Sequence, residues 1–295
     1  MKNYNTKRRN GGIKLSATGT AIVVTVFVII YILDSVFGLG NKKVTGECEF
    51  HFIDVGQGDA TMIITEENVV LIDTGTQDHA DSLLTYVKSY TDTIDYMILT
   101  HPHEDHIGGA DEIIESIHVK NVIMSDADSN TYTFTKLLDA IERENINLIE
   151  GVAGDSYTAG EIEFTILSPL TEFRDYNDYS LVTKVEFGNT SAIITGDVET
   201  HSERDMLEKY SFTTLKADIF QVGHHGSYTS NSTDFIRTID PDYAVISCGI
   251  DNEYGHPHRE TLEKLKKYDI TYYRTDEVGS IVFFSDGKEL EYKNQ

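Results

Sequence analysis

The sequence predicts an α/β fold in which mixed β-sheets are covered by helices, and three observations lead to this prediction. Strand-like runs alternate with helix-like segments from Glu47 to the C-terminal region. The first strand-like runs follow one another through short turns, whereas later strands and helices interleave, as in layered α/β proteins. Only four prolines and no internal repeat interrupt the pattern, and 295 residues suffice for a sizeable core.

The individual elements follow from local composition. Apolar and β-branched runs predict strands at residues 48–55, 60–65, 69–73, 96–100, 119–124, 162–167, 181–187, 191–195, 219–222, 243–247 and 280–285. Helical spacing predicts helices at residues 80–89, 109–116, 135–144, 202–210, 232–239 and 258–268. Polar residues near three helix starts are the expected caps, namely Asp81, Thr135 and Ser232.

The N-terminal region has a different character. Residues 15–33 form an uncharged run of 19 residues, close to the length of a bilayer-spanning helix. Basic residues precede this run, so the positive-inside rule predicts a cytoplasmic N-terminus and an extracellular domain. A cleaved secretory signal is the alternative, and it also places the domain outside the cell. We expect a cytoplasmic tail, a transmembrane anchor, a linker and a folded domain at residues 1–14, 15–33, 34–46 and 47–295.

Charge and cysteine content limit the function classes. The formal net charge is −25, and seven of the 24 basic side chains precede Val44, so the domain is strongly acidic. This charge repels nucleic acid unless a basic patch or a bound metal overrides it, and a solvated acidic surface explains most of it. Cys48 and Cys248 form no disulfide framework. They are expected either as one bridge or as two buried free thiols.

The stretch that carries chemistry reads T-H-P-H-E-D-H-I-G-G over residues 100–109. An apolar strand leads to His101, and His103 projects to the same side of an extended backbone. Asp105 and His106 follow where two glycines turn the chain into a helix. Two imidazoles can hold one divalent ion while the carboxylate and the third imidazole hold another, and such mixed ligands suit zinc, manganese or iron.

This stretch matches the H-x-H-x-D-H signature, and the chain resembles the metallo-β-lactamase superfamily. V-L-I-D-T-G at 70–75, I-I-T-G-D at 193–197 and Q-V-G-H-H-G-S at 221–227 follow in the family's order. The resemblance implies an αββα four-layer sandwich that binds two divalent ions, zinc first and manganese as the alternative. It also implies that Asp73 orients a ligand from behind the metals and that Asp197 bridges both of them.

Three further segments resemble one subgroup of this superfamily. F-I-D-V-G-Q-G-D-A at 52–60, the paired histidines and Y-G-H-P-H at 254–258 are similar to the hydrolase domain of the competence channel ComEC and to phosphorylcholine esterase. The likeness covers about residues 47–285, without the multi-span channel. Residues 174–181 lack the further histidine of many superfamily members. The first metal is then expected to bind His101, His103 and Asp197, with waters completing its coordination.

Other site residues have more than one expected role. The resemblance implies that His225 is a ligand of the second metal and that His224 meets the substrate as a proton donor to a leaving oxygen; the reverse assignment is the alternative. Asn177 or Asp178 is expected to touch the metal-bound water or the substrate, if it is not an ordinary turn residue. Glu199 either orients a ligand or is a solvated helix-start acid. His256, or else His258 on the other side of Pro257, is expected to line the pocket, and Asp105 is expected to act in catalysis besides binding metal.

The expected function is metal-assisted hydrolysis, in which a hydroxide held by two ions attacks a phosphodiester. The substrate is expected to be DNA or a phospho-substituent of the cell surface. Hydrolysis of a lactone, thioester or other ester is the alternative reaction, and a non-catalytic surface binding module is the alternative class. The sequence indicates membrane attachment through one N-terminal helix and identifies no protein partner.

Overall fold

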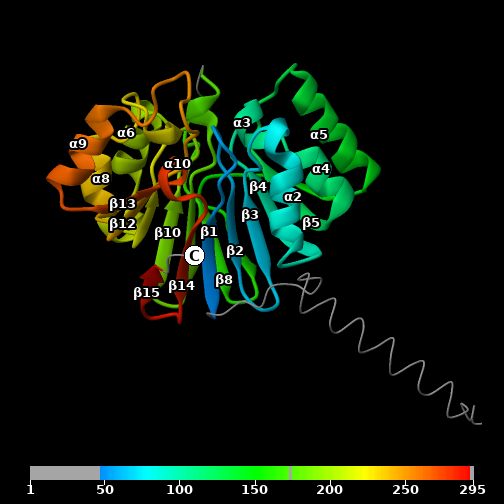
Figure 1. Cartoon of the computed structure of the whole chain (residues 1–295), viewed down its shortest axis with the longest axis horizontal. Coiled ribbons are helices and arrows are strands. Elements are labelled where there is room, and N and C mark those ends of the chain that lie inside the picture. Colours follow the sequence, from blue (N-terminus) through cyan, green and yellow to red (C-terminus); the bar gives the residue numbers. More distant parts are fainter. Residues whose placement is uncertain (1–46, 173–174, 293–295) are drawn as a thin grey trace, which may run out of the picture. The chain divides into compact units, whose positions relative to one another are not determined.

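The computed structural model describes residues 47–172 and 175–292, which form two sheets packed face to face (Figure 1). The first sheet has the strand order β15 (Leu290–Tyr292), β14 (Ile281–Ser285), β1 (Cys48–Phe52), β2 (Thr61–Ile64), β3 (Val69–Ile72), β4 (Thr93–Leu99), β5 (His118–Met124) and β6 (Asn147–Glu150). The second has the order β13 (Thr271–Arg274), β12 (Tyr243–Ile246), β11 (Ile219–Gln221), β10 (Thr190–Ile194), β9 (Thr183–Phe187), β8 (Ile162–Ile166) and β7 (Ser156–Ala159).

Helices cover the outer face of each sheet (Figure 1). The first sheet carries α2 (Ala80–Lys88), α4 (Ala110–Ser116) and α5 (Tyr132–Arg143). The second carries α6 (Thr200–Lys209), α7 (Phe212–Leu215), α8 (Thr233–Ile239) and α9 (Arg259–Lys267). The order of layers is therefore helix, sheet, sheet, helix, and the predicted α/β sandwich is confirmed.

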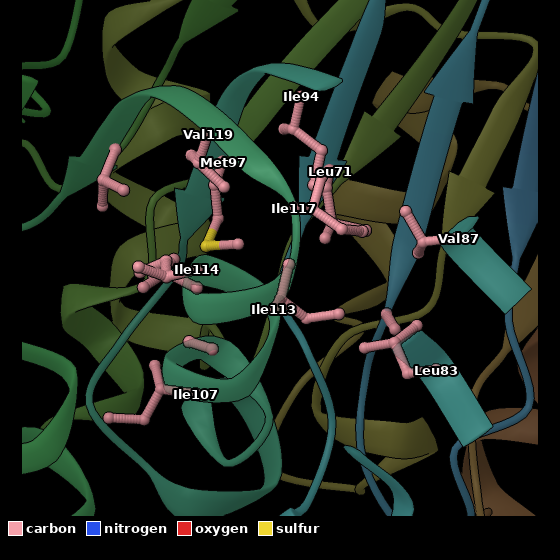
Figure 2. Packing of buried hydrophobic residues seen from close by; sticks show 14 of the residues in the cluster. Leu71, Leu83, Val87, Ile94, Met97, Ile107, Ile113, Ile114, Ile117 and Val119 are labelled. Atoms are coloured by element: carbon pink, nitrogen blue, oxygen red, sulfur yellow. The ribbon is translucent and has the colours of Figure 1, made fainter. Parts of the chain in front are cut away.

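Alternation along the strands explains these layers. Neighbouring strand residues point to opposite faces of a sheet. In β3, Leu71 packs under the helices, whereas Val70 and Ile72 pack between the two sheets. Figure 2 shows the helix-facing side, where Leu71 and Met97 lie near residues of α2 and α4. Both faces of the central strands are thus buried, which fits their continuous apolar runs.

Two of the predicted helix caps are wrong. The 3-10 turn Gln77–His79 (η1) leads directly into α2, so Asp81 lies inside the helix. Helix α5 begins at Tyr132 because the extended residue Thr131 caps it, its hydroxyl accepting the N–H of Phe134. Only the third prediction is confirmed, since Ser232 accepts the N–H of Phe235 at the start of α8.

The predicted tail, anchor and linker at residues 1–14, 15–33 and 34–46 lie outside the described residues. Among the helices of residues 47–172 and 175–292, none has the length and apolar character needed to cross a bilayer.

Both cysteines are free thiols in this structure. Cys48 is buried between the two sheets, and Cys248 is buried in the cluster beneath the second helical layer. Burial raises the pKa of Cys248 to about 12 and raises that of Cys48 further. The two cysteines were expected either as one disulfide bridge or as two buried free thiols, and the structure contains the free thiols.

Candidate metal centre and active site

The predicted ligands follow the carboxyl ends of strands from both sheets. His101 and His103 come after β4 and lead into the short helix α3 (Glu104–Ile107), which carries Asp105 and His106. On the second sheet, residue 197 follows β10 and residue 225 lies in the 3-10 turn His224–Gly226 (η3) after β11. These residues come from both sheets, yet they lie in one cluster. Helix α3, which carries two of them, lies at one end of the sheets (Figure 1).

The first group of candidate ligands consists of His101, His103 and Asp197. Nε2 of His101 lies 2.9 Å from Nδ1 of His103 and 3.9 Å from Oδ2 of Asp197. His101 is buried, and burial together with the nearby His106 lowers its pKa well below the usual value. A neutral imidazole is the form that binds metal. The group therefore has three converging donors, and the buried ring of His101 is in the neutral form that binds metal.

The second group consists of Asp105, His106, Asp197 and His225, whose ligand atoms lie within 4.8 Å of one another. Nε2 of His106 lies 3.2 Å from Oδ1 of Asp197. Nε2 of His225 lies 3.2 Å from Asp105 Oδ2 and 3.6 Å from Asp197 Oδ1. One oxygen of Asp197 therefore faces the first group and the other faces the second, a geometry suited to a carboxylate that bridges two ions.

The outer nitrogens of two ligand histidines have their own partners. Nδ1 of His106 lies 2.7 Å from Oδ2 of Asp73, which also accepts the hydroxyl of Thr100, while Oδ1 of Asp73 accepts the N–H of Thr100. Nδ1 of His225 lies 3.0 Å from the carbonyl oxygen of Ser247 and donates to it. Such bonds fix the ring and direct Nε2 to the ligand side. Asp73 thus lies behind His106, at the end of β3.

The cluster has the charge and the unpaired atoms of a cation site. Among the described residues, the ion pairs of Asp59, Asp73, Asp105 and Asp197 are all with histidines. Nε2 of His106 and Oδ1 of Asp197 are buried and lie 3.2 Å apart as an ion pair, but neither makes a hydrogen bond of good geometry. Unpaired buried polar atoms are costly and demand an explanation. Two divalent cations would satisfy them and balance the carboxylates, so the residues fit a two-metal centre.

The pKa values reflect this concentration of acids. Burial disfavours the charged forms of His106 and His225, yet the surrounding carboxylates, Asp197 foremost, raise the pKa of both. His225 reaches about 9. Burial also opposes the anion of Asp197, but His106 and His225 hold its pKa well below the usual value. The cluster without metal is therefore a set of coupled ion pairs, in which protons occupy positions that cations can take.

His224 differs from its neighbour His225 in environment. Both lie in η3 with a left-handed φ of 52°. His224 is 22% exposed, and its Nε2 lies 3.7 Å from Asp197 Oδ2. Its Nδ1 lies 3.4 Å from Oε1 of Glu199, the N-cap residue of α6. Although burial opposes protonation, Glu199 and Asp197 raise the pKa of His224.

A pocket of about 470 Å³ adjoins both ligand groups, and Asn177, His224 and His256 line it together with Gln57 and Tyr254. Burial and the neighbouring His225 lower the pKa of His256 to about 4, so this ring is neutral at pH 7.

Two residues near the predicted site have separate structural contacts. Asp178 accepts the backbone N–H groups of residues 199 and 202 at the start of α6. His258 is the N-cap residue of α9, and its Nδ1 accepts the N–H of Tyr228.

Sequence reasoning missed Asp59, although it lies in the quoted G-Q-G-D segment at the end of a predicted turn. Oδ2 of Asp59 accepts a hydrogen bond from Gln221 Nε2, which joins the two halves of the sandwich. Its buried Oδ1 lies 3.9 Å from Nδ1 of His225 and has no hydrogen-bond partner. Burial raises the pKa of Asp59 to about 6. A short polar motif between two strands was the available signal.

Comparison with known proteins agrees with this fold and site. The family model of the metallo-beta-lactamase superfamily matches residues 53–250, and the chain belongs to this superfamily. Solved structures support the fold. The CmlA beta-hydroxylase E377D mutant superposes with a TM-score of 0.57 at 14% identity, covering 88% of this chain and 59% of that one. YhfI from Bacillus subtilis superposes with a TM-score of 0.55 at 11% identity, covering 84% and 100%.

Curated relatives show which members of the superfamily the chain resembles. ComE operon protein 3 of Bacillus subtilis is 32% identical over 271 residues, covering 85% of this chain and 34% of that protein. Recombination protein 2 of Haemophilus influenzae is 32% identical over 247 residues, covering 81% and 29%. Competence protein ComA of Neisseria gonorrhoeae is 28% identical and covers 78% and 31%. The predicted resemblance to competence proteins is confirmed, and the chain spans about a third of their length.

Proposed function

We propose that the protein is a membrane-anchored, extracytoplasmic phosphodiesterase that depends on two divalent metal ions. One observation carries the proposal: two ligand groups share Asp197, and the protonatable pair of His224 and Glu199 lies beside that shared residue. This combination suits hydrolysis of an ester whose leaving oxygen needs a proton. Zinc is the expected metal, with manganese as the alternative.

The bound ions would activate water and neutralise negative charge on the phosphoryl oxygens. The chain's own residues would do the rest. His101, His103, Asp105, His106, Asp197 and His225 would hold the ions. His224, kept protonated by Glu199, would donate a proton from Nε2 to the leaving oxygen. Asp73 would keep Nε2 of His106 directed at the centre through its bond to Nδ1.

The pocket favours a cell-surface phospho-substituent over DNA as the substrate. Among the described residues that line it, none is Lys or Arg, whereas Glu104 and Tyr254 are present in addition to the candidate metal ligands. Backbone phosphates of DNA are usually bound by basic side chains. An acid and an aromatic ring instead suit a phosphodiester that carries a cationic group. DNA remains the second candidate because the relatives include proteins named for competence and recombination.

The test uses the full-length chain purified in detergent. Zinc and manganese would each be added to the metal-free protein, which would then be offered bis(p-nitrophenyl) phosphate, p-nitrophenyl phosphorylcholine, single-stranded DNA, a thioester and a lactone. We expect metal-dependent cleavage of phosphodiesters and its loss in His103→Ala. Activity that survives His103→Ala, or cleavage of the thioester or lactone alone, would overturn the proposal. Absence of both metal binding and cleavage would instead support a binding module.

The location is tested separately. Uncharged residues 15–33 follow a basic N-terminal segment, which supports an anchor with the domain outside the cell. Protease added to intact cells should degrade a C-terminally tagged chain while sparing a cytoplasmic marker. A tag that is digested only after lysis would contradict this orientation.

A further inference from the structure

We propose that the side-chain oxygen of Asn177 is a protein ligand of the first metal. The inference rests on the proposed metal-dependent function and deepens it, because it completes the smaller of the two ligand groups. That group otherwise has only His101, His103 and Asp197 among the described residues, whereas the second has four members.

The position of Asn177 brings it to this group. It begins the 3-10 turn Asn177–Tyr179 (η2), and its chain neighbours touch the other ligands. The ring of Tyr176 packs edge-on against His103, with 5.7 Å between centroids. The hydroxyl of Ser180 lies 3.3 Å from Nδ1 of His101 and accepts the N–H of Asp197. The turn is therefore fixed against all three members of the first group.

The side chain of Asn177 has one end bound and one end free. The residue is 8% exposed, lines the pocket, and forms a side-chain hydrogen bond with Glu199. A carboxylate can only accept, so the amide group of Asn177 donates this bond and its Oδ1 is directed elsewhere. Oδ1 is buried and has no hydrogen-bond partner. A cation in the first group would satisfy this oxygen, which is otherwise costly to bury.

The added ligand changes the chemistry of the first metal site. With Asn177 it has two imidazole nitrogens and two oxygens as protein donors. Imidazole suits zinc, whereas carboxylate and carbonyl oxygens suit manganese. Glu199 then has two tasks, since it orients the amide of Asn177 and also contacts His224. The site is expected to bind manganese better, relative to zinc, than one with a third imidazole.

Metal binding to the full-length chain tests the inference directly. Metal-free wild type, Asn177→Ala, Asn177→Asp and Asn177→His would be titrated with Zn²⁺ and Mn²⁺ by calorimetry, and with Co²⁺ by visible absorption. We expect wild type to bind two ions. Asn177→Ala should lose affinity for one of them by at least about 10–100-fold, the range found when only the hydrogen-bonding partner of a ligand is removed, and keep the other. Asn177→Asp should retain both ions, and Asn177→His should raise the Zn²⁺ to Mn²⁺ affinity ratio.

Gln57→Ala is the matched control, because Gln57 is an amide in the same pocket and lies outside the ligand groups. Both of its metal affinities should match wild type. If Asn177→Ala keeps both affinities and the wild-type Co²⁺ spectrum, the inference is wrong while the proposed function stands. If wild type binds no metal, the proposed function fails first. Should Asn177→Ala not fold, an unchanged metal preference in Asn177→His would overturn the inference.

Discussion

Among single side chains, His224 has the environment expected of a proton donor. Its replacement by Ala should lower kcat by about 10²–10⁴-fold for substrates with a poor leaving group, the range for general acid catalysis. For a p-nitrophenolate leaving group, which needs no proton, the loss should be much smaller. Steady-state kinetics on alkyl and p-nitrophenyl phosphodiesters provide the comparison. Equal losses on both would argue against proton donation, and exposed His201→Ala serves as the control.

The protonation of His225 predicts how metal binding depends on pH. Without metal its pKa is raised to about 9, so at pH 7 the ring carries a proton on both nitrogens. Nδ1 keeps its bond to Ser247, so a metal must displace the proton on Nε2. Affinity should therefore rise as the pH rises from 6 towards 9. Calorimetry in two buffers of different ionisation enthalpy measures the proton release, and a heat that is independent of buffer would refute it.

At the level of elements, Glu203 of α6 supports the loop that carries His224 and His225. Its buried carboxylate accepts the backbone N–H groups of Asn231 and Ser232. The amide of Asn231 in turn accepts the N–H of Gly223 and donates to its carbonyl oxygen. Because φ at His224 and His225 is left-handed, a strained conformation for a residue with a side chain, the loop needs such support.

Glu203→Ala is therefore expected to destabilise the protein by about 1–3 kcal/mol, since buried N–H groups lose their partner. It should also weaken binding of the second metal, for which His225 is a candidate ligand. Urea denaturation and zinc titration measure the two effects. Glu208→Ala on the exposed side of the same helix is the control and should change neither. A Glu203→Ala protein with wild-type stability would contradict the proposed support.

Sequence reasoning predicted the central elements and missed the outer ones. All four strands that were not predicted, β6, β7, β13 and β15, lie at the edges of the two sheets. Edge strands bury less surface, and β6 is almost wholly exposed, so their residues lack a continuous apolar run. The predicted helices have a buried stripe, which gives them a periodic pattern that sequence retains.

The sequence predicted only part of the candidate site. Short motifs predicted the candidate ligands, because each motif lies at the end of a predicted strand. The contact of Glu199 with His224 and the unpaired oxygen of Asn177 depend on how two distant loops meet. Glu203 resembles any other acid on a helix, so no pattern in the sequence separates it from a solvated residue.

For the molecule as a whole, the candidate metal centre joins the two halves of the sandwich. Asp105 and His106 come from the first sheet, and Asp197 and His225 come from the second. Each bound ion should therefore stabilise the fold, by about 2.7 kcal/mol when the free ion is at 100 times its Kd. At about 2–4 °C per kcal/mol, chelation should lower Tm by roughly 5–11 °C for each ion removed. Calorimetric scans with and without chelator test this, and His103→Ala should show a smaller shift.

The positions of the two thiols allow local opening of the protein to be measured from their rates of chemical labelling. Cys48 lies between the sheets and Cys248 beneath the outer helices, and both are buried. A thiol reagent should therefore modify each one only when its own layer opens. If the sandwich opens as a unit, the two labelling rates should be equal; if the helical layer detaches first, Cys248 should react sooner. Mass spectrometry of the labelled peptides distinguishes cooperative opening from layer-by-layer opening without any engineered probe.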